Sequence, residues 1–187
     1  MDYCLSMAGM NVSAETCGTM APYRFEPACS PHLAAELAGT EIEIAQIVSA
    51  AQTLASEYDC LIVEGAGGCM VPLNRRELML DLMAKLNLPV LLAARPGLGT
   101  INHTLLSIRA LREADLEIAG IVFVAGAAGE SGVIEEDNVF TIEQFGGIPM
   151  LGTIPFCPQL RGTSPIYSAL PVTVVAEIEK IANRLGL

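Results

Sequence analysis

The sequence predicts an α/β fold in which a mostly parallel sheet is covered by helices on both faces, as in a doubly wound sheet. Short continuous apolar segments alternate along the chain with segments whose apolar residues repeat every three or four positions. Strands that alternate with helices in this way form parallel sheets. A continuous apolar strand indicates that both of its faces are covered. The chain shows no internal repeat and no linker, so we expect a single domain over residues 1–187.

The helices are predicted from cap residues and apolar periodicity. Ser30 and Pro31 are a favourable N-cap and first helical residue. Thr40 and Glu43 have the spacing of a capping box and predict another helix start. The segment 11–24 mixes Gly, Ser, Thr and Pro and is expected to form a loop. The expected helices span residues 3–9, 30–37, 40–58, 78–86, 101–114, 135–145 and 172–185.

The strands are predicted from the apolar segments, and each is followed by a loop rich in Gly or Pro. The expected strands are Cys60–Val63, Pro89–Ala94, Ile118–Ala125 and Met150–Ile154. The loops are EGAGG (64–68), RPGLGTINH (95–103), AGAAGESG (125–132) and PFCPQLRG (155–162). Ligands of open α/β sheets bind outside the carboxyl ends of the strands. The four loops therefore predict one shared ligand site, although loops of this composition also occur without function.

Charge and composition narrow the possible functions. Ten basic and 21 acidic residues give a net charge of −11, which repels nucleic acid and anionic membranes, so neither is expected as a partner. No apolar segment reaches the roughly 18–20 residues of a membrane helix. The six cysteines include no CxxC pair, which favours free thiols in a reducing cytoplasm over disulfides or a zinc site. Cys60 and Cys157 lie in apolar surroundings and are expected to be buried.

Two of the loops contain groups that bind ligands in other proteins. Glu64 follows an apolar strand and precedes small residues, so its carboxylate either holds Mg²⁺ or faces solvent across a tight turn. Thr100 is expected to cap a helix whose free N–H groups, at Ile101, Asn102 and His103, would bind a carboxylate or phosphate. The alternative is a capped helix end in solvent. The phosphate-binding pattern GxxxxGK followed by Ser or Thr does not occur.

Four segments taken together, EGAGGCMVPLN, RPGLGTINHTLLSI, PYRFEPACSPHLAAE and TIEQFGGIPMLGTIPF, resemble dethiobiotin synthetase from about Asp2 to about Gln159. That family closes a ureido ring on 7,8-diaminononanoate with CO₂, ATP and Mg²⁺ in biotin biosynthesis. The resemblance implies a P-loop NTPase-like fold and a cytoplasmic homodimer. The family's first strand, P-loop, helix and second strand have no counterpart here, so the catalytic residues are unknown and we expect an N-terminally incomplete chain that is inactive alone. Without that P-loop strand, Cys60–Val63 and Val90–Ala94 are expected to have an unpaired edge.

The resemblance also implies roles for individual residues. It assigns Mg²⁺ to Asp2 and Glu64. The implied ATP contacts are Asp2, Glu64, Gly65, Ala66, Gly67, Pro155, Phe156 and Cys157. The implied substrate contacts are Gly67, Thr100, Ile101 and Asn102, the last three binding a carboxylate through their amides across a dimer interface. The family often has Asn-Asp for base recognition where this chain has Val124-Ala125, so base selectivity does not follow from the resemblance.

Two alternative functions are open at this point. One is a non-catalytic remnant that keeps only the dimerisation and substrate-binding surface. The other is a different P-loop synthetase, such as a cobyrinate amidation domain. A P-loop encoded in frame upstream of Met1 would favour the ligase.

Overall fold

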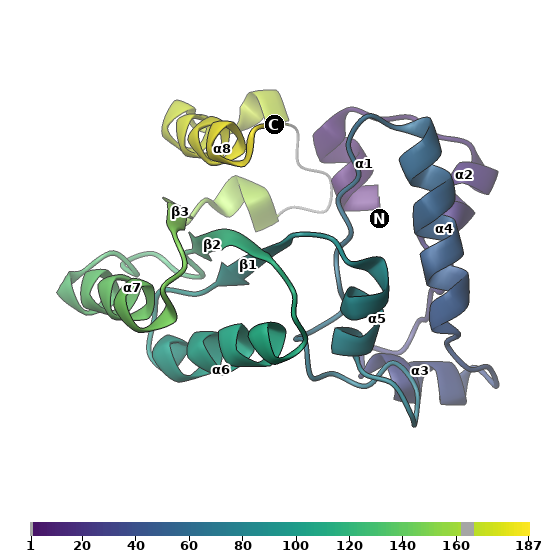
Figure 1. Cartoon of the computed structure of the whole chain (residues 1–187). Helices are drawn as coiled ribbons and strands as arrows, with labels where there is room; N and C mark the ends of the chain where they lie inside the picture. The colour runs from purple at the N-terminus through teal and green to yellow at the C-terminus, as the bar shows by residue number, and fades with distance from the viewer. Residues whose placement is uncertain (1, 162–166) are drawn as a thin grey trace. The chain divides into compact units, whose positions relative to one another are not determined.

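The computed structural model describes residues 2–161 and 167–187, which form two compact units. The first unit comprises Met10–Leu88. The second comprises Asp2–Gly9 together with Pro89–Leu187. Figure 1 labels the helices and strands of both units. Residue 162, the last residue of the predicted PFCPQLRG loop, lies outside the described residues.

The second unit is built on a parallel sheet of three strands in the order β1-β2-β3. The strands are β1 (Val90–Ala94), β2 (Ile118–Val124) and β3 (Met150–Ile154). The helices of this unit are α1 (Asp2–Ala8), α6 (Thr100–Glu113), α7 (Val133–Gly146) and α8 (Val172–Leu185), with short 3-10 turns at Pro158–Arg161 and Tyr167–Ala169. The strand positions agree with the prediction, and α6 and α7 are the crossover helices between successive strands.

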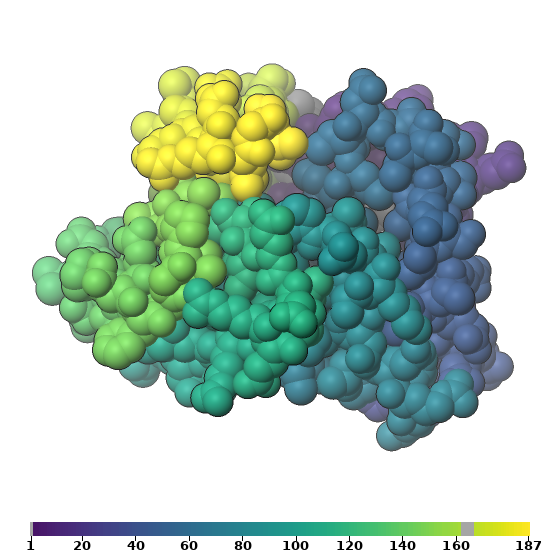
Figure 2. Space-filling model, in the orientation of Figure 1, coloured from purple at the N-terminus to yellow at the C-terminus, as the bar shows by residue number. Residues whose placement is uncertain are grey.

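Alternate residues of the central strand β2 face opposite sides of the sheet. Ile121 and Phe123 pack in one core cluster with residues of α6 and α7, including Ile142. Val122 points to the other face and packs against β3 and α8. Figure 1 shows α6 and α7 on one side of the sheet and α8 on the other. In space-filling form, the side chains of α8 lie directly over those around β3 (Figure 2). The prediction of a parallel sheet covered on both faces is therefore confirmed.

Helix α1 belongs to the second unit because it is anchored to the chain that follows β3. The hydroxyl of Tyr3 donates a hydrogen bond to the carbonyl of Leu160 at 2.6 Å. Met7 packs against the cluster that contains the buried Cys157. The expected burial of Cys157 is confirmed, and the helix that begins at Asp2 is fixed beside the PFCPQLRG loop.

The first unit is helical in its described elements. These are α2 (Ala14–Met20), α3 (Pro31–Leu37), α4 (Ile44–Glu57) and α5 (Met79–Leu86). Their core consists of Ala35, Ile42, Ile44, Leu73, Met79 and Leu82. None of the helices over residues 2–161 and 167–187 is long and apolar enough to cross a membrane.

The strand predicted at Cys60–Val63 is wrong as a description of this structure. These residues have no regular secondary structure, Ile62 is 80% exposed, and Cys60 is exposed rather than buried. A strand is stabilised by hydrogen bonds to a neighbour, and no strand of the described residues pairs with this segment. Among the described residues, strand β1 has one neighbour in the sheet order, and Leu91 is 45% exposed, so the other edge of β1 is unpaired within this part of the chain, as expected.

Two helix starts also differ from the prediction. The expected loop at 11–24 contains α2, which is capped by Ser13 through a hydrogen bond from the N–H of Thr16 to its Oγ at 3.1 Å. Helix α4 begins at Ile44, not after Thr40. Its N-cap residue Glu43 donates its backbone N–H to the hydroxyl of Tyr23 at 2.9 Å. The predicted capping box does not form, and the N-cap N–H is satisfied by a distant tyrosine instead.

Candidate functional site

The EGAGG loop belongs to the first unit and carries an unpaired carboxylate. Glu64 is exposed and forms no hydrogen bond or ion pair with the described part of the chain. Gly67 has a φ of +89°, and a Cβ there would lie 2.9 Å from Cγ2 of Val71. A Cβ at Gly65 would lie 3.1 Å from the sulfur of Met79. The backbone conformation of this loop therefore requires a glycine at position 67. The Glu64 carboxylate is exposed and is available to a ligand.

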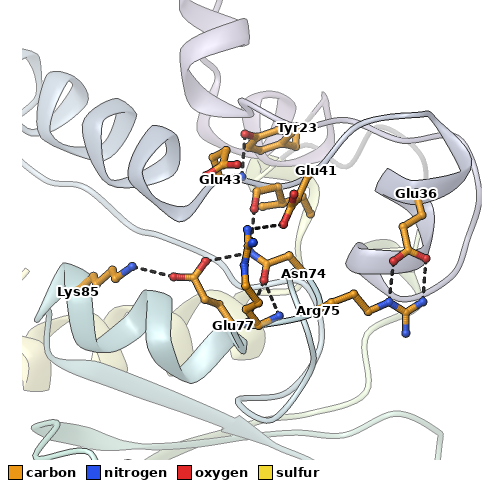
Figure 3. Close-up of polar contacts among 10 residues, drawn as sticks. Tyr23, Glu36, Glu41, Glu43, Asn74, Arg75, Glu77 and Lys85 are labelled. Atoms are coloured by element: carbon orange, nitrogen blue, oxygen red, sulfur yellow. Dashed lines mark hydrogen bonds and ion pairs between the residues drawn. The ribbon is translucent and has the colours of Figure 1, made fainter.

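Asn74 fastens the segment that follows the EGAGG loop (Figure 3). Its side chain is 5% exposed, and its Nδ2 donates to the carbonyl of Ile42 at 3.0 Å and to Oε2 of Glu77 at 2.9 Å. Its Oδ1 accepts from the backbone N–H groups of Arg76 and Glu77 at 2.8 and 2.9 Å. The side chain thus satisfies two backbone N–H groups of a tight turn and holds this turn against the segment before α4. No sequence pattern predicts this role of Asn74.

Glu77 connects that turn to α5. Its Oε1 accepts from Nζ of Lys85 at 2.8 Å. The hydrogen bond from Lys85, followed by that from Asn74, lowers the pKa of the Glu77 carboxyl. Nearby, Arg75 donates two hydrogen bonds to Glu36, at 2.6 and 2.7 Å, and this pairing lowers the pKa of Glu36 (Figure 3).

The N-terminus of α6 carries free backbone donors in the second unit. Helix α6 begins at Thr100, and its N-cap is Gly99, so the prediction that Thr100 is the N-cap is wrong. Gly99 adopts a φ of +89°, which a side chain would strain. The Thr100 N–H donates to the carbonyl of Gly97 at 3.2 Å, and that of His103 donates to Gly99 at 3.3 Å. In this first turn of α6, the amides of Ile101 and Asn102 therefore have no partner among the described residues, whereas those of Thr100 and His103 are hydrogen-bonded.

An open hollow of about 320 Å³ lies between the end of β1 and the first turns of α6. Its lining includes Arg95, Leu98, Thr100, His103 and Thr104. Thr100 and Thr104 are buried, and their hydroxyl oxygens lie 3.2 Å apart. The hollow offers apolar surface beside hydroxyl, imidazole and guanidinium groups, which suits a small ligand with an anionic end.

The three loops that follow the strands of the second unit contact one another. Oε2 of Glu130 accepts from the N–H groups of Gly126 and Ala127. Arg161 donates to the carbonyl of Gly126, and its guanidinium carbon lies 5.0 Å from the centroid of the Phe156 ring. A Cβ at Gly97 would lie 3.3 Å from Oε1 of Glu130. The loops RPGLGTINH, AGAAGESG and PFCPQLRG therefore lie against one another within this unit, and a ligand site shared by all four loops stays a prediction.

The remaining predicted site residues lie near these loops or in the first unit. Asp2 is exposed in the first turn of α1, the helix anchored beside the PFCPQLRG loop. Pro155 is exposed, Phe156 is half-buried, and the thiol of the buried Cys157 donates to Oε1 of Gln159 at 3.2 Å. Ala66 is exposed next to Gly67 in the first unit. Among the residues described, no three His, Cys, Asp or Glu side chains form a group that could hold a metal ion.

The chain matches one protein-family model and several curated relatives in sequence. The family model AAA_26, described as an AAA domain, matches residues 11–164. The ATP-dependent dethiobiotin synthetase of Halalkalibacterium halodurans is 42% identical over 140 residues, which are 74% of this chain and 57% of the relative. That of Thermodesulfovibrio yellowstonii is 35% identical over 162 residues, 83% of this chain and 66% of the relative. That of Bacillus licheniformis is 35% identical over 166 residues, 89% of this chain and 69% of the relative.

The chain belongs to the dethiobiotin synthetase family. It spans 57% and 66% of the length of the first two of these relatives. The resemblance found in the four sequence segments is thereby confirmed at the level of the family, and so is the α/β fold of the P-loop NTPase type.

Proposed function

We propose that this chain, as one synthetase-like domain over residues 1–187, takes part in ATP- and Mg²⁺-dependent ring closure on 7,8-diaminononanoate with CO₂. The observation that carries the proposal is its identity with ATP-dependent dethiobiotin synthetases over most of its length. The free amides of Ile101 and Asn102 in the first turn of α6 support it independently, and Thr100 and His103 of the same turn line a hollow at the end of β1. We further propose a homodimer in the cytoplasm, in keeping with the resemblance.

The reaction has three chemical steps in this proposal. An amine of the substrate attacks CO₂, forms a C–N bond and loses a proton, which gives a carbamate. ATP with Mg²⁺ supplies the phosphoryl group that turns a carbamate oxygen into a leaving group, and ADP is released. The second amine then attacks the carbamate carbon, the ring closes, and inorganic phosphate and a proton depart. Most of the catalysis in such a transfer comes from positioning and neutralisation of charge.

The chain's own residues would hold the substrate at its carboxylate end. The N–H groups of Ile101 and Asn102 can both donate to one carboxylate, and the positive end of the α6 dipole favours the negative charge. The hollow lined by Thr100 and His103 offers the apolar side chains of Leu92 and Leu98 to the aliphatic chain of the substrate. We also propose Gly67 as a contact of the substrate, as the resemblance implies.

The residues proposed for Mg²⁺ and ATP fit these groups chemically. Asp2 and Glu64 are exposed, carry no ion pair among the described residues, and present the hard oxygen atoms that Mg²⁺ prefers. The ATP contacts are proposed along Glu64–Gly67 and Pro155–Cys157, as the resemblance implies. Near the latter, the stacked pair of Arg161 and Phe156 provides a cation beside an aromatic face.

A reconstitution experiment tests the proposal. The 187-residue chain is assayed for ADP release and for fixation of labelled bicarbonate into an acid-stable product. It is tested alone and after fusion to a strand–P-loop–helix–strand segment from the Halalkalibacterium halodurans relative. We expect no turnover by the chain alone, because it has no P-loop lysine. The fusion should show turnover that depends on diaminononanoate, and Glu64→Gln should lower it at least tenfold.

Two results would contradict this function. One is ADP release by the fusion that does not respond to diaminononanoate. The other is a Glu64→Gln fusion with unchanged turnover at limiting Mg²⁺. A chain that binds diaminononanoate but supports no turnover in the fusion would instead favour a non-catalytic substrate-binding module.

A further inference from the structure

Asn138 is a buried polar residue of α7 that the proposed reaction does not use. Its side chain is 9% exposed, and its Nδ2 donates a hydrogen bond to the carbonyl of Pro96 at 2.9 Å. Pro96 is itself among the fully buried residues. Loss of one partner from such a buried pair leaves the other unsatisfied, so the bond holds the peptide between Pro96 and Gly97 firmly against α7.

The carbonyl of Pro96 lies at the start of the turn that leads into α6. The next carbonyl, that of Gly97, accepts from the N–H of Thr100 at 3.2 Å. Gly99 then turns the chain with its positive φ, and the side chain of Thr100 is buried. The turn is therefore held at Pro96 by Asn138 and at Thr100 by the helix. The next two residues after Thr100 are Ile101 and Asn102, which carry the free amides.

We propose that Asn138 is a positioning residue that sets the direction of the Ile101 and Asn102 amides for carboxylate binding. This inference rests on the proposed function, since it concerns the same carboxylate site. Hydrogen bonds weaken steeply as the donor turns away from the acceptor, so a small rotation of this turn lowers the affinity for a carboxylate. A bond that only stabilises the fold would instead leave the ligand preference unchanged.

The test compares two probes on the ¹⁵N-labelled 187-residue chain by NMR titration. The probes are 7,8-diaminononanoate and its carboxamide, which differ only at the end that the amides would bind. Asn138→Asp keeps the size of the side chain and removes the donor, and Asn138→Ala removes the side chain. Ile142→Val is the matched control, because Ile142 is buried one turn further along α7 and belongs to the core cluster.

The wild-type chain should bind the carboxylate more tightly than the carboxamide, with shifts at the Ile101 and Asn102 amides. Both Asn138 variants should bind the carboxylate about tenfold more weakly and the carboxamide as before. Ile142→Val should keep the wild-type ratio. If the Asn138 variants discriminate between the probes as the wild-type chain does, the inference is overturned and the substrate site stands.

A second measurement needs no variant and covers the case in which the Asn138 variants do not fold. The side-chain amide resonances of Asn138 in the wild-type chain should shift on titration with the carboxylate and not with the carboxamide. Their failure to move, while the Ile101 and Asn102 amides respond, overturns the positioning role. A wild-type chain that does not distinguish the two probes contradicts the proposed substrate site itself.

Discussion

Nζ of Lys85 lies 2.8 Å from Oε1 of Glu77, and this ion pair links helix α5 to the turn that follows the EGAGG loop. The second carboxylate oxygen of Glu77 accepts from the buried Asn74. The two contacts together lower the pKa of the Glu77 carboxyl below its ordinary value of 4.5. Their contribution to stability must therefore depend on pH.

Glu77→Gln should lower the free energy of unfolding by roughly 0.5–1 kcal/mol at pH 7, because the Lys85 pair is partly exposed. A carboxyl whose pKa is lowered in the folded state stabilises the protein at pH values above the pKa of the unfolded state. That stabilisation is lost as the pH falls through the folded pKa. The difference between wild type and variant should thus shrink well below pH 4.5. Urea unfolding at pH 7 and pH 3 measures it, with the exposed Glu179→Gln as control. A difference that is equal at both pH values would rule out this linkage.

Asn74→Ala should cost about 1–3 kcal/mol, since it leaves buried or half-buried partners of the side chain unsatisfied. Asn183→Ala, at an exposed position of α8, should change the free energy of unfolding by less than about 0.5 kcal/mol. Equilibrium urea unfolding compares the two variants. Equal stability of both would show that Asn74 does not fasten the turn.

Two neighbouring glycines of the EGAGG loop should respond differently to substitution. Gly67→Ala should cost about 1–2 kcal/mol, because Gly67 has a positive φ and the new Cβ would meet Val71. Gly68→Ala should be close to neutral, since a Cβ there has nothing within 4 Å. Thermal and urea unfolding of the pair measure this contrast. Equal effects would mean that the loop does not hold the described conformation.

The fold of the second unit could be predicted from sequence because its signals are local. The bounds of β3 and α8 agree with the prediction, since a continuous apolar segment and a 3.6-residue period can be recognised within a few turns of chain. The start of α4 could not be predicted in this way, because its N-cap residue Glu43 donates its N–H to the hydroxyl of Tyr23, 20 residues away. Helix α2 was missed because Gly18 and its threonines have low helix propensity, although Ser13 is an adequate cap signal.

The candidate site was predicted in part for the same reason. The helix-end donors at Ile101 and Asn102 could be expected from a strand followed by a glycine turn and a helix. Asn74 and Asn138 could not, because a single asparagine carries no sequence pattern and both act on carbonyls more than 30 residues away. The strand at Cys60–Val63 was predicted from composition alone, which cannot supply a neighbouring strand.

The unpaired edge of β1 predicts a response to an added strand. Fusion of the strand–P-loop–helix–strand segment described above should increase the hydrogen-exchange protection of amides in β1 and at Leu61–Val63, because paired backbone groups exchange more slowly. Exchange monitored by mass spectrometry, with and without the segment, tests this. Strong protection at Leu61–Val63 in the 187-residue chain alone would contradict the expectation.

The central claim is that the α6 N-terminus binds the carboxylate of the substrate, and the most direct measurement is calorimetric titration of two Ile101 variants with 7,8-diaminononanoate. Ile101→Pro deletes a free N–H in the first turn, where proline is tolerated, and Ile101→Ala removes the side chain but keeps that N–H. We expect Ile101→Ala to bind the substrate within about threefold of wild type and Ile101→Pro to bind about tenfold more weakly, as for the loss of one hydrogen bond to a charged group. Equal affinity of the two variants would contradict the claim.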